Sequence, residues 1–346
     1  MPSLQRGVVP IYRQLVDQLR NDILTCRLIP GQRIPSITEL QRSHGIARET
    51  AKRVLNLLEA QGLIRQQPGK GSFVADLRPM QPAWGLVFPF FSVQYEDLIL
   101  LVAEQARQAG RTLHHLCDYN NYEEEMRLVQ TMINDRYEAV IVIPTLDESR
   151  TLDFYEKLAP MGTRIVLLDH TMSSRDFPFV VQSYDLGVVR ALTYLMWLKG
   201  GGVAFVENEV WPGRNMVLEL MRETYLDLMR RERPGFEPLI LPRARGVDAA
   251  ALRQRGITAI FCCDDLSAIQ VIGRLHEQGM EIPRDYNLVS YGNTDIGRYF
   301  TPPISSVDPR NAEMARIVAA LLAPEPETPS ESCQHVVHPE LILRET

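Results

Sequence analysis

The sequence predicts an α/β protein in two parts: a small helical domain ending in a two-stranded hairpin, and a larger two-lobed body of parallel sheets covered by helices. Three observations predict this. Apolar residues recur at helical spacing in three segments before residue 62. Two short strands then flank the stretch "PGKG". After residue 83, short apolar strands alternate with amphipathic helices.

The length of 346 residues suits two or three domains. We expect the helical domain in residues 1–75 and the two-lobed body in residues 83–346. Between them, residues 76–82 form an extended linker, because Pro79 and Pro82 interrupt it. The start lacks the apolar core of a signal peptide, and no apolar run approaches the roughly 18 residues of a membrane span. We therefore expect a cytoplasmic protein that meets no membrane.

The five cysteines indicate neither disulfide bonds nor a metal site. Cys26, Cys117, Cys262, Cys263 and Cys333 form no CxxC pair and no ligand cluster, so we expect reduced thiols and no metal site. Adjacent cysteines suggest either redox chemistry or, as we favour, small buried residues of a strand.

The net charge of −6 hides a division between the two parts. The helical domain holds 11 Lys and Arg against 5 Asp and Glu, a balance of +6. The remainder holds 26 against 38, a balance of −12. A basic small domain on an acidic body indicates that the first part meets a polyanion.

The N-terminal domain is predicted as three helices and a hairpin. Residues 10–26 place apolar residues on one face at helical spacing, and the turn "IPGQRIPS" ends that pattern. Ser36 and Glu39 have the spacing of a capping box, which begins a short second helix. A third helix is expected over residues 47–61, before Gly62. The stretches "LIRQQ" and "SFV" are predicted as strands around the turn.

Three helices followed by a hairpin form a winged helix, whose third helix enters the major groove of DNA. The first turns of that helix carry Arg48 and Lys52 on the outward face, with Thr50 close by. Glycines in the wing tip "GKG" let the backbone approach a phosphate, because no Cβ intervenes. A single cation is more often part of a solvated helix face. Here the cation face, the turn, the wing and the charge balance agree on DNA binding.

The stretches "PGQRIPS", "ARETAKR" and "GKGSFV", in this order and spacing, resemble the GntR-type winged helix over nearly its whole length. The resemblance implies DNA contacts from the second helix, the third helix and the wing. Thr38 departs from the family, which usually has an arginine there, so this contact would carry no charge. The expected DNA contacts are Ser36, Thr38, Arg48, Thr50, Lys52, Arg53, Gly69, Lys70 and Gly71.

The body alternates strands and helices in a pattern typical of parallel sheets covered on both faces. Its strand candidates are "WGLVF", "TLHHLC", "AVIVI", "RIVLLD", "FVVQS", "GVAFVE", "PLIL", "AIFCC" and "YNLVSY". Helices are expected near residues 94–110, 121–136, 185–199, 212–232 and 264–279. Neither GxGxxG nor GxxxxGK[ST] occurs, so nothing indicates dinucleotide or P-loop binding.

In open parallel sheets, ligands bind beyond the carboxyl ends of the strands. Carboxylates, amides and aromatic rings at these ends suit a polyol, because hydroxyls pair with the polar groups and sugar C–H faces stack on rings. Asp264 is equally suited to cap the helix that follows it, and Trp211 to lie in the core. The strand-end residues are Phe90, Phe91, Asp118, Asp169, His170, Glu207, Asn208, Trp211, Asp264, Asp265, Tyr291 and Asn293.

The stretches "AIFCCDDLSAIQVIGRLHEQGMEIPRDYNLVSYGN" and "RYFTPPISSVDP" resemble the LacI/GalR-type effector domain, a relative of periplasmic sugar-binding proteins. The resemblance extends over roughly residues 83–346. GntR-type regulators of the arabinose-repressor kind join this winged helix to this periplasmic-binding-protein-like domain. The resemblance implies two lobes joined by crossovers near residues 183–186, 304–309 and 324–333, with residues 83–184 and 307–323 in the first lobe and residues 185–306 and 333–346 in the second.

The family's ligand residues carry over in part. Asp169 stands where the family has its strand-end aspartate, whereas Gly292 replaces another aspartate and leaves Asn293 as the nearest polar group. The family's arginine falls on Met221, and Arg222, one residue on, points about 100° away around a helix. The expected effector contacts are Phe90, Asp118, Asp169, Trp211, Arg222, Asp264, Tyr291 and Asn293.

These features predict a ligand-responsive repressor that binds a palindromic operator as a homodimer and a sugar or sugar-like effector between its lobes. The effector domains are expected to dimerise, because one winged helix offers too few contacts for a specific site. The alternative is a constitutive DNA binder whose body only dimerises. An enzyme is not expected: a pyridoxal site needs a strand-end lysine, and only Lys157 and Lys199 follow the linker. We expect no cofactor.

Overall fold

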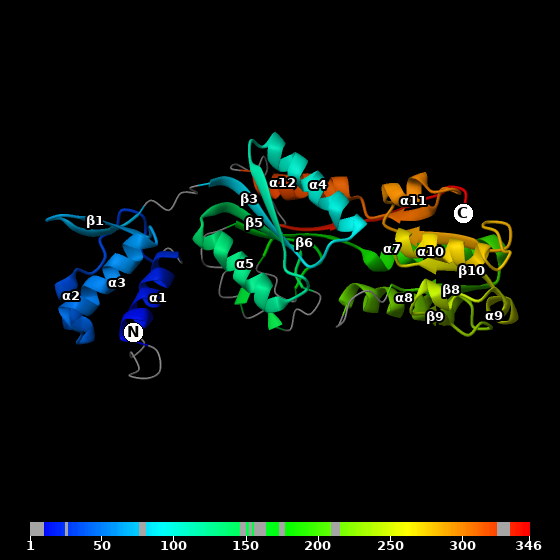
Figure 1. Cartoon of the computed structure of the whole chain (residues 1–346), viewed down its shortest axis with the longest axis horizontal. Helices are drawn as coiled ribbons and strands as arrows, with labels where there is room; N and C mark the ends of the chain where they lie inside the picture. The colour runs from blue at the N-terminus through cyan, green and yellow to red at the C-terminus, as the bar shows by residue number, and fades with distance from the viewer. Residues whose placement is uncertain are drawn as a thin grey trace.

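The computed structural model describes residues 10–24, 27–75, 81–145, 150–151, 154–155, 164–172, 177–208, 215–323 and 333–346. A winged helix, a first lobe and a second lobe follow one another along its longest axis (Figure 1). The fold class expected from the sequence is confirmed: a helical domain with an antiparallel wing precedes two largely parallel sheets. Among the described helices, none has both the length and the apolar character needed to cross a membrane.

The winged helix has the predicted three helices and hairpin. The side-chain oxygen of Ser36 accepts the Glu39 N–H at 3.3 Å, and the Glu39 carboxylate accepts the Ser36 N–H at 2.6 Å. This capping box begins the second helix, as the spacing predicts. Leu15, Leu40 and Leu58, one from each helix, are buried together in the core. The elements are α1 (Ile11–Leu24), α2 (Ile37–His44), α3 (Arg48–Ala60), β1 (Ile64–Gln67) and β2 (Gly71–Val74).

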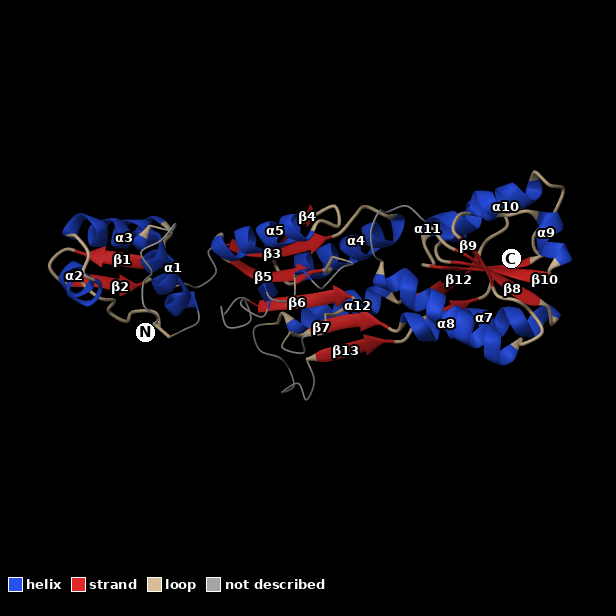
Figure 2. Ribbon diagram, turned by 90° about the horizontal axis from the view of Figure 1, so that it is seen from below, coloured by secondary structure: helices blue, strands red, loops and turns tan. Residues whose placement is uncertain are grey.

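The first lobe is a six-stranded sheet in the order β13-β7-β6-β5-β3-β4, with all neighbouring strands parallel (Figure 2). Helices α4 and α12 pack on each other over one face, and α5 packs on β3 and β5 at the other. The elements are β3 (Gln81–Phe88), α4 (Val93–Gln108), β4 (Thr112–Cys117), α5 (Tyr122–Asn134), β5 (Tyr137–Val142), β6 (Arg164–Asp169), β7 (Phe179–Gln182), α12 (Asn311–Leu321) and β13 (Gln334–Val337).

The second lobe has the sheet order β14-β12-β11-β10-β8-β9, in which only the β12–β14 pair is antiparallel. Helices α7 and α8 cover one face, and α9 and α10 cover the other. The elements are α7 (Tyr184–Lys199), β8 (Gly202–Val206), α8 (Met216–Glu232), β9 (Leu239–Leu241), η3 (Ala244–Gly246), α9 (Ala249–Gln254), β10 (Ile257–Cys262), α10 (Asp265–His276), β11 (Asn287–Tyr291), α11 (Asp295–Tyr299), β12 (Ser305–Asp308) and β14 (Glu340–Ile342).

The chain passes between the lobes at places that differ in part from the expectation. One passage lies between β7 and α7, and a second between β12, in the second sheet, and α12, in the first lobe. A third lies at residues 338–339, because β13 pairs with β7 in the first sheet and β14 pairs with β12 in the second. The assignment of all of residues 333–346 to the second lobe was therefore wrong. Residues 324–332 of the expected third crossover lie outside the described residues.

The linker is also shorter than expected at its C-terminal end. β3 begins at Gln81, so residues 81–82 of the expected linker 76–82 belong to the sheet of the first lobe. Pro82 is tolerated near the beginning of this strand, where the ladder has a register irregularity and one lost N–H donor costs little. Residues 76–80 lie outside the described residues.

Candidate functional site

A tight turn joins the two strands of the wing and exposes the Lys70 side chain. The Lys70 N–H donates to the Gln67 carbonyl at 3.0 Å, and Gly69 has a φ of +75°. Proline followed by a residue with positive φ is typical of a type II turn, and Pro68 with Gly69 meets that requirement. Gly69 and Lys70 are both exposed, at the position where the wing is expected to meet DNA.

Helix α3 turns its predicted DNA-contacting face outward. Arg48 and Lys52 are exposed and Thr50 is half-buried, while the opposite face fills the core of the domain. The N-cap residue Ala47 makes no side-chain capping hydrogen bond. Because no side chain caps them, the first backbone N–H groups of the helix can donate hydrogen bonds to a DNA phosphate. The helix dipole also favours a negative charge at this end.

A hydrogen-bonded link joins this helix to the wing. The side-chain amide of Gln66 donates to Asn56 at 3.1 Å and to Glu59 at 2.9 Å, and its backbone N–H donates to Glu59 at 2.8 Å. The link holds the wing at one angle to the recognition helix. Gln66 was not predicted from the sequence, because strand periodicity does not show which helix a polar side chain will meet.

Other expected DNA contacts are oriented by neighbours within the domain. The Arg53 guanidinium lies over the ring of Tyr12, 4.1 Å from its centroid. Ser36 acts as the cap of α2, while Thr38 is exposed one residue into that helix. Gly71 has a φ of +115°, where a side chain would be strained.

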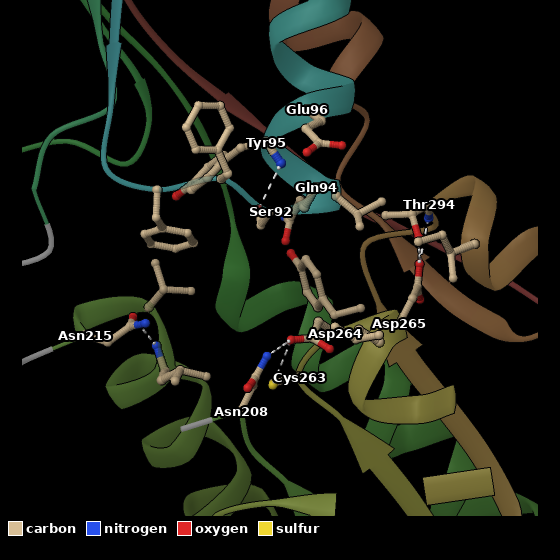
Figure 3. A pocket seen from close by; sticks show the side chains of 18 of the residues that line it. Ser92, Gln94, Tyr95, Glu96, Asn208, Asn215, Cys263, Asp264, Asp265 and Thr294 are labelled. Carbon is tan, nitrogen blue, oxygen red and sulfur yellow. Dashed lines mark hydrogen bonds between the residues drawn. The ribbon is translucent and has the colours of Figure 1, made fainter. Parts of the chain in front are cut away.

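A cleft of about 420 Å³ lies between the two lobes (Figure 3). The first lobe contributes the segment between β3 and α4 together with the first turn of α4. The second lobe contributes α8 and the segments that follow β8, β10 and β11. The described lining residues are Phe90, Phe91, Ser92, Val93, Gln94, Tyr95, Glu96, Tyr184, Asn208, Asn215, Val217, Leu218, Met221, Cys263, Asp264, Asp265, Leu266, Tyr291, Thr294 and Ile296.

Several strand-end residues reach this cleft, as expected for parallel sheets. One of them, Asp264, combines the two roles that the sequence left open. Its Oδ1 accepts the Ser267 N–H at 2.6 Å and so caps α10, and its Oδ2 accepts the Asn208 amide at 2.8 Å beside the cleft. The strand-end residues in the lining are Phe90, Phe91, Asn208, Asp264, Asp265 and Tyr291.

Asp169 lies behind the cleft rather than in its lining. Its buried carboxylate accepts the hydroxyls of Tyr95 at 3.0 Å and Tyr184 at 2.8 Å, and the Gln182 amide at 2.6 Å. Burial alone would raise the pKa of Asp169, but His170, followed by the Gln182 amide and the Tyr184 hydroxyl, lowers it. The expected ligand contact is therefore a residue that positions two tyrosines of the lining.

The same network continues into the second lobe. The Tyr291 hydroxyl donates to the Gln182 side chain at 2.7 Å, and the rings of Tyr184 and Tyr291 stack with centroids 5.6 Å apart. A Cβ on Gly187 would lie 2.6 Å from the Tyr291 ring, so only glycine lets α7 approach this closely. The cleft floor is thus hydrogen-bonded across the passage between β7 and α7.

Two further expected effector residues are engaged elsewhere and do not line the cleft. Arg222 donates from Nε and Nη2 to the two carboxylate oxygens of Glu207, at 2.8 Å each. The Asn293 amide donates to Asp308 at 2.9 Å, while its oxygen accepts a hydrogen bond from Arg344. Asn293 was expected from its place at a strand end, and Arg222 because it follows Met221, where the resemblance places the family's arginine. Neither reason shows that a neighbouring charged or amide group already satisfies the side chain.

Asp118 is buried within the first lobe, and Trp211 lies outside the described residues. Asp118 Oδ1 accepts the Asn120 N–H at 2.8 Å, and its Oδ2 has no hydrogen-bond partner among the described residues. Burial, with the nearby charge of Glu125, raises the pKa of Asp118 to about 8. Asp118 is therefore a buried acid near the strand ends of the first lobe and does not line the cleft.

The polar cluster at the beginning of α4 was not predicted from the sequence. Ser92 caps this helix by accepting the Tyr95 N–H at 3.2 Å, and Gln94 and Glu96 of the same turn also line the cleft (Figure 3). The available signal was Ser92 itself, because a serine at the N-cap position marks where the loop after β3 ends and α4 begins. Tyr184 gave no such signal, since its role depends on Asp169.

The cleft offers groups for binding rather than for catalysis. Carboxylates, amides, hydroxyls and aromatic rings line it. Burial, with the nearby charge of Asp264, raises the pKa of the Cys263 thiol well above its usual value, so this sulfur is a poor nucleophile. Within the described residues, no group of His, Cys, Asp and Glu side chains is arranged to hold a metal ion.

A winged helix joined to two lobes around such a cleft defines a class of proteins, the DNA-binding regulators with a ligand-binding domain. Comparisons with known proteins agree with this class. The model of the bacterial regulatory proteins of the gntR family matches residues 11–74. The model of the periplasmic binding protein-like domain matches residues 203–346.

One relative matches over nearly the whole chain, and others match over part of it. The chain is 21% identical over 361 residues to an arabinose metabolism transcriptional repressor of Geobacillus stearothermophilus, covering 99% of this chain and 98% of that one. It is 28% identical over 102 residues to a ribose operon repressor of Haemophilus influenzae, covering 29% of this chain and 31% of that repressor's length. A solved LacI family transcriptional regulator from Enterococcus faecium, with bound ribose, superposes with a TM-score of 0.61 at 18% identity, covering 76% of this chain and 97% of that one.

The chain is therefore a transcriptional regulator, not an enzyme, that joins a GntR-type DNA-binding domain to a periplasmic-binding-protein-like, LacI-type effector domain. This confirms the resemblance read from "ARETAKR", "GKGSFV" and the C-terminal stretches of the sequence.

Proposed function

We propose that this regulator is a cytoplasmic repressor that binds a palindromic operator as a homodimer and releases or tightens its hold when a small molecule enters the interlobe cleft. The observation that carries the proposal is the cleft itself, whose lining comes from both lobes of a chain that also bears a winged helix. Relatives named as repressors of arabinose and ribose genes support a sugar or sugar-like effector.

The cleft provides the means of response. A ligand that touches both lobes binds the closed arrangement more tightly than the open one, and only such differential affinity shifts the balance between them. The Gln182–Tyr291 hydrogen bond and the stacked Tyr184 and Tyr291 lie where the lobes would move against each other. Tyr184 and Tyr291 also line the cleft, so a ligand that contacts them would change how two effector domains hold their winged helices.

Exposed apolar residues support dimerisation through the effector domain. In the first lobe, Leu100 is 70% exposed and Tyr119 68% exposed, and in the second lobe Tyr299 is 76% exposed. α4, which carries Leu100, and α11, which carries Tyr299, lie on the same side of the molecule in both whole-chain views (Figures 1 and 2). Large exposed apolar side chains suit a self-complementary interface.

The first test is a thermal-shift screen of the full chain with sugars, sugar alcohols, sugar acids and sugar phosphates. A ligand at about one hundred times its dissociation constant adds about 2.7 kcal/mol. At about 2–4 °C per kcal/mol for a domain of this size, the shift is easily measured. The hit is then added to operator DNA, selected from random sequence by the protein, in an anisotropy titration.

The alternative function is a constitutive DNA binder whose effector domain only dimerises. One observation favours it: Arg222 is paired with Glu207, while Met221, which the resemblance places at the family's ligand-gripping arginine, lines the cleft with an apolar side chain. A screen without any thermal shift, together with operator binding that no compound changes, would select this alternative. A hit that changes operator affinity would reject it.

A further inference from the structure

The described residues that line the cleft carry charges of one sign. Among the described residues of the lining, Glu96, Asp264 and Asp265 carry carboxylates, and none carries a lysine, arginine or histidine side chain. Asp264 has neutral donors as partners, namely the Ser267 N–H and the Asn208 amide, so its charge is not cancelled locally. Arg222 is, among the residues that the structure describes, the arginine closest in sequence to a lining residue. Its guanidinium is paired with the Glu207 carboxylate.

Two of these carboxylates line the cleft from opposite lobes. Glu96 is exposed in the first turn of α4 in the first lobe, and Asp264 precedes α10 in the second (Figure 3). Closing the lobes brings these like charges nearer, which costs free energy in a cleft that loses water. A positive charge between them removes that cost. A neutral ligand does not remove it, and an anion increases it.

The aromatic lining acts in the same direction. Phe91 is 56% exposed at the cleft and is supported by Phe88, whose ring meets it edge-on with centroids 5.0 Å apart. Phe90 packs on Tyr95 with centroids 5.1 Å apart. The faces of such rings are electron-rich, so they attract a cation as well as the C–H face of a sugar.

We infer that the cleft selects a ligand with a protonated amine, such as an amino sugar, over its neutral parent and against its carboxylated form. The inference rests on the proposed function, since it names the chemical class of the effector for that same cleft. Glu96 and Asp264 receive the ammonium group from the two lobes, and Phe90 and Phe91 take the apolar face of the ring. Bridging the two carboxylates favours the closed arrangement.

The test is isothermal titration calorimetry of the full chain with matched sets built on glucose, galactose and mannose. Each set holds the 2-amino-2-deoxy sugar, the parent sugar and the uronic acid. At least one amino sugar should bind about tenfold or more tightly than its parent, and its uronic acid should not bind detectably. Raising NaCl from about 0.05 to about 0.5 M should weaken the amino sugar more than the parent, because salt screens the ionic contact.

The variant Glu96→Gln should remove most of the preference for the amino sugar and its salt dependence. Glu223→Gln, an exposed carboxylate of α8 outside the cleft lining, is the matched control and should retain both. Thermal melts confirm that each variant is folded.

The outcomes separate this inference from the proposed function. Equal or tighter binding of the parent sugars or uronic acids, or no binding by any amino sugar, would overturn the inference. The repressor proposal survives that result if another compound of the wider screen binds and changes operator affinity. It fails with the inference only if no compound binds and none alters operator binding.

Discussion

The buried carboxyl of Asp118 should make the effector domain less stable as the pH rises. Asp118 is fully buried, and its pKa lies near 8 because of burial and then the charge of Glu125. The folded pKa is raised above the ordinary value of 3.8, so the folded state binds this proton more tightly. The associated stability is complete at acid pH and is lost as the pH rises through the folded pKa.

The magnitude follows from linkage. Between about pH 6 and about pH 8 the unfolded chain has lost this proton and the folded chain still holds much of it, so unfolding free energy falls by about 2 to 3 kcal/mol. At about 2–4 °C per kcal/mol, the melting temperature falls by about 5–10 °C. The variant Asp118→Asn has no such proton and should lose less stability over the same interval.

The assay is urea unfolding of the full chain at both pH values, followed by tryptophan fluorescence. Trp84 of β3 is 1% exposed and reports on the first lobe. Asp227→Asn is the control for removing a carboxylate, since the Asp227 side chain on α8 is 81% exposed. Equal losses of stability in the wild type and Asp118→Asn would refute the reasoning and show that Asp118 is already ionised at about pH 6.

Further predictions concern the DNA interface and the cleft. Arg48→Ala should abolish specific operator binding and leave effector binding intact in calorimetry. Lys70→Ala should weaken binding to all DNA sequences and lower the salt slope by about one in anisotropy titrations. Asp169→Asn should weaken ligand binding, because Tyr95 loses a charged acceptor worth about 1.5–3 kcal/mol, while DNA affinity stays unchanged without ligand. Gly187→Ala should cost about 1–3 kcal/mol in urea unfolding through overpacking against the Tyr291 ring, which lies 2.6 Å from the added Cβ.

Each of these has an outcome that contradicts it. Normal operator affinity in Arg48→Ala would remove α3 from the contacts, and an unchanged salt slope in Lys70→Ala would remove the wing. Unaltered ligand affinity in Asp169→Asn would show that the tyrosines need no buried carboxylate. Wild-type stability in Gly187→Ala would show that α7 shifts without cost.

Local pattern predicted most strands and helices of the body. The stretch "RIVLLD" coincides with β6, because four consecutive apolar residues buried on both faces are typical of a central parallel strand. "TLHHLC" coincides with β4, although this strand lies at the sheet edge and has exposed side chains. Local pattern did not predict β13 and β14, whose mixed residues take their structure from the strands they pair with.

The candidate site was predicted less completely than the fold. Strand ends pointed to Phe90, Asp264 and Tyr291 because every parallel strand delivers its last residue to the same edge. Whether such a residue is available to a ligand depends on its partners. Tyr95 lies 74 residues from Asp169 in the chain and still bonds to it, and no spacing rule anticipates that contact.

The sequence by itself determined the winged helix, the parallel sheets and the class of protein, because helix caps, turns and apolar periodicity act over a few residues. Only the tertiary structure decided which sheet each C-terminal strand joins and which strand-end side chains remain open to a ligand. It also showed that the described cleft lining carries acidic and no basic side chains. These outcomes depend on residues distant in the chain, because a buried polar group takes whichever partner the packing brings within hydrogen-bond distance.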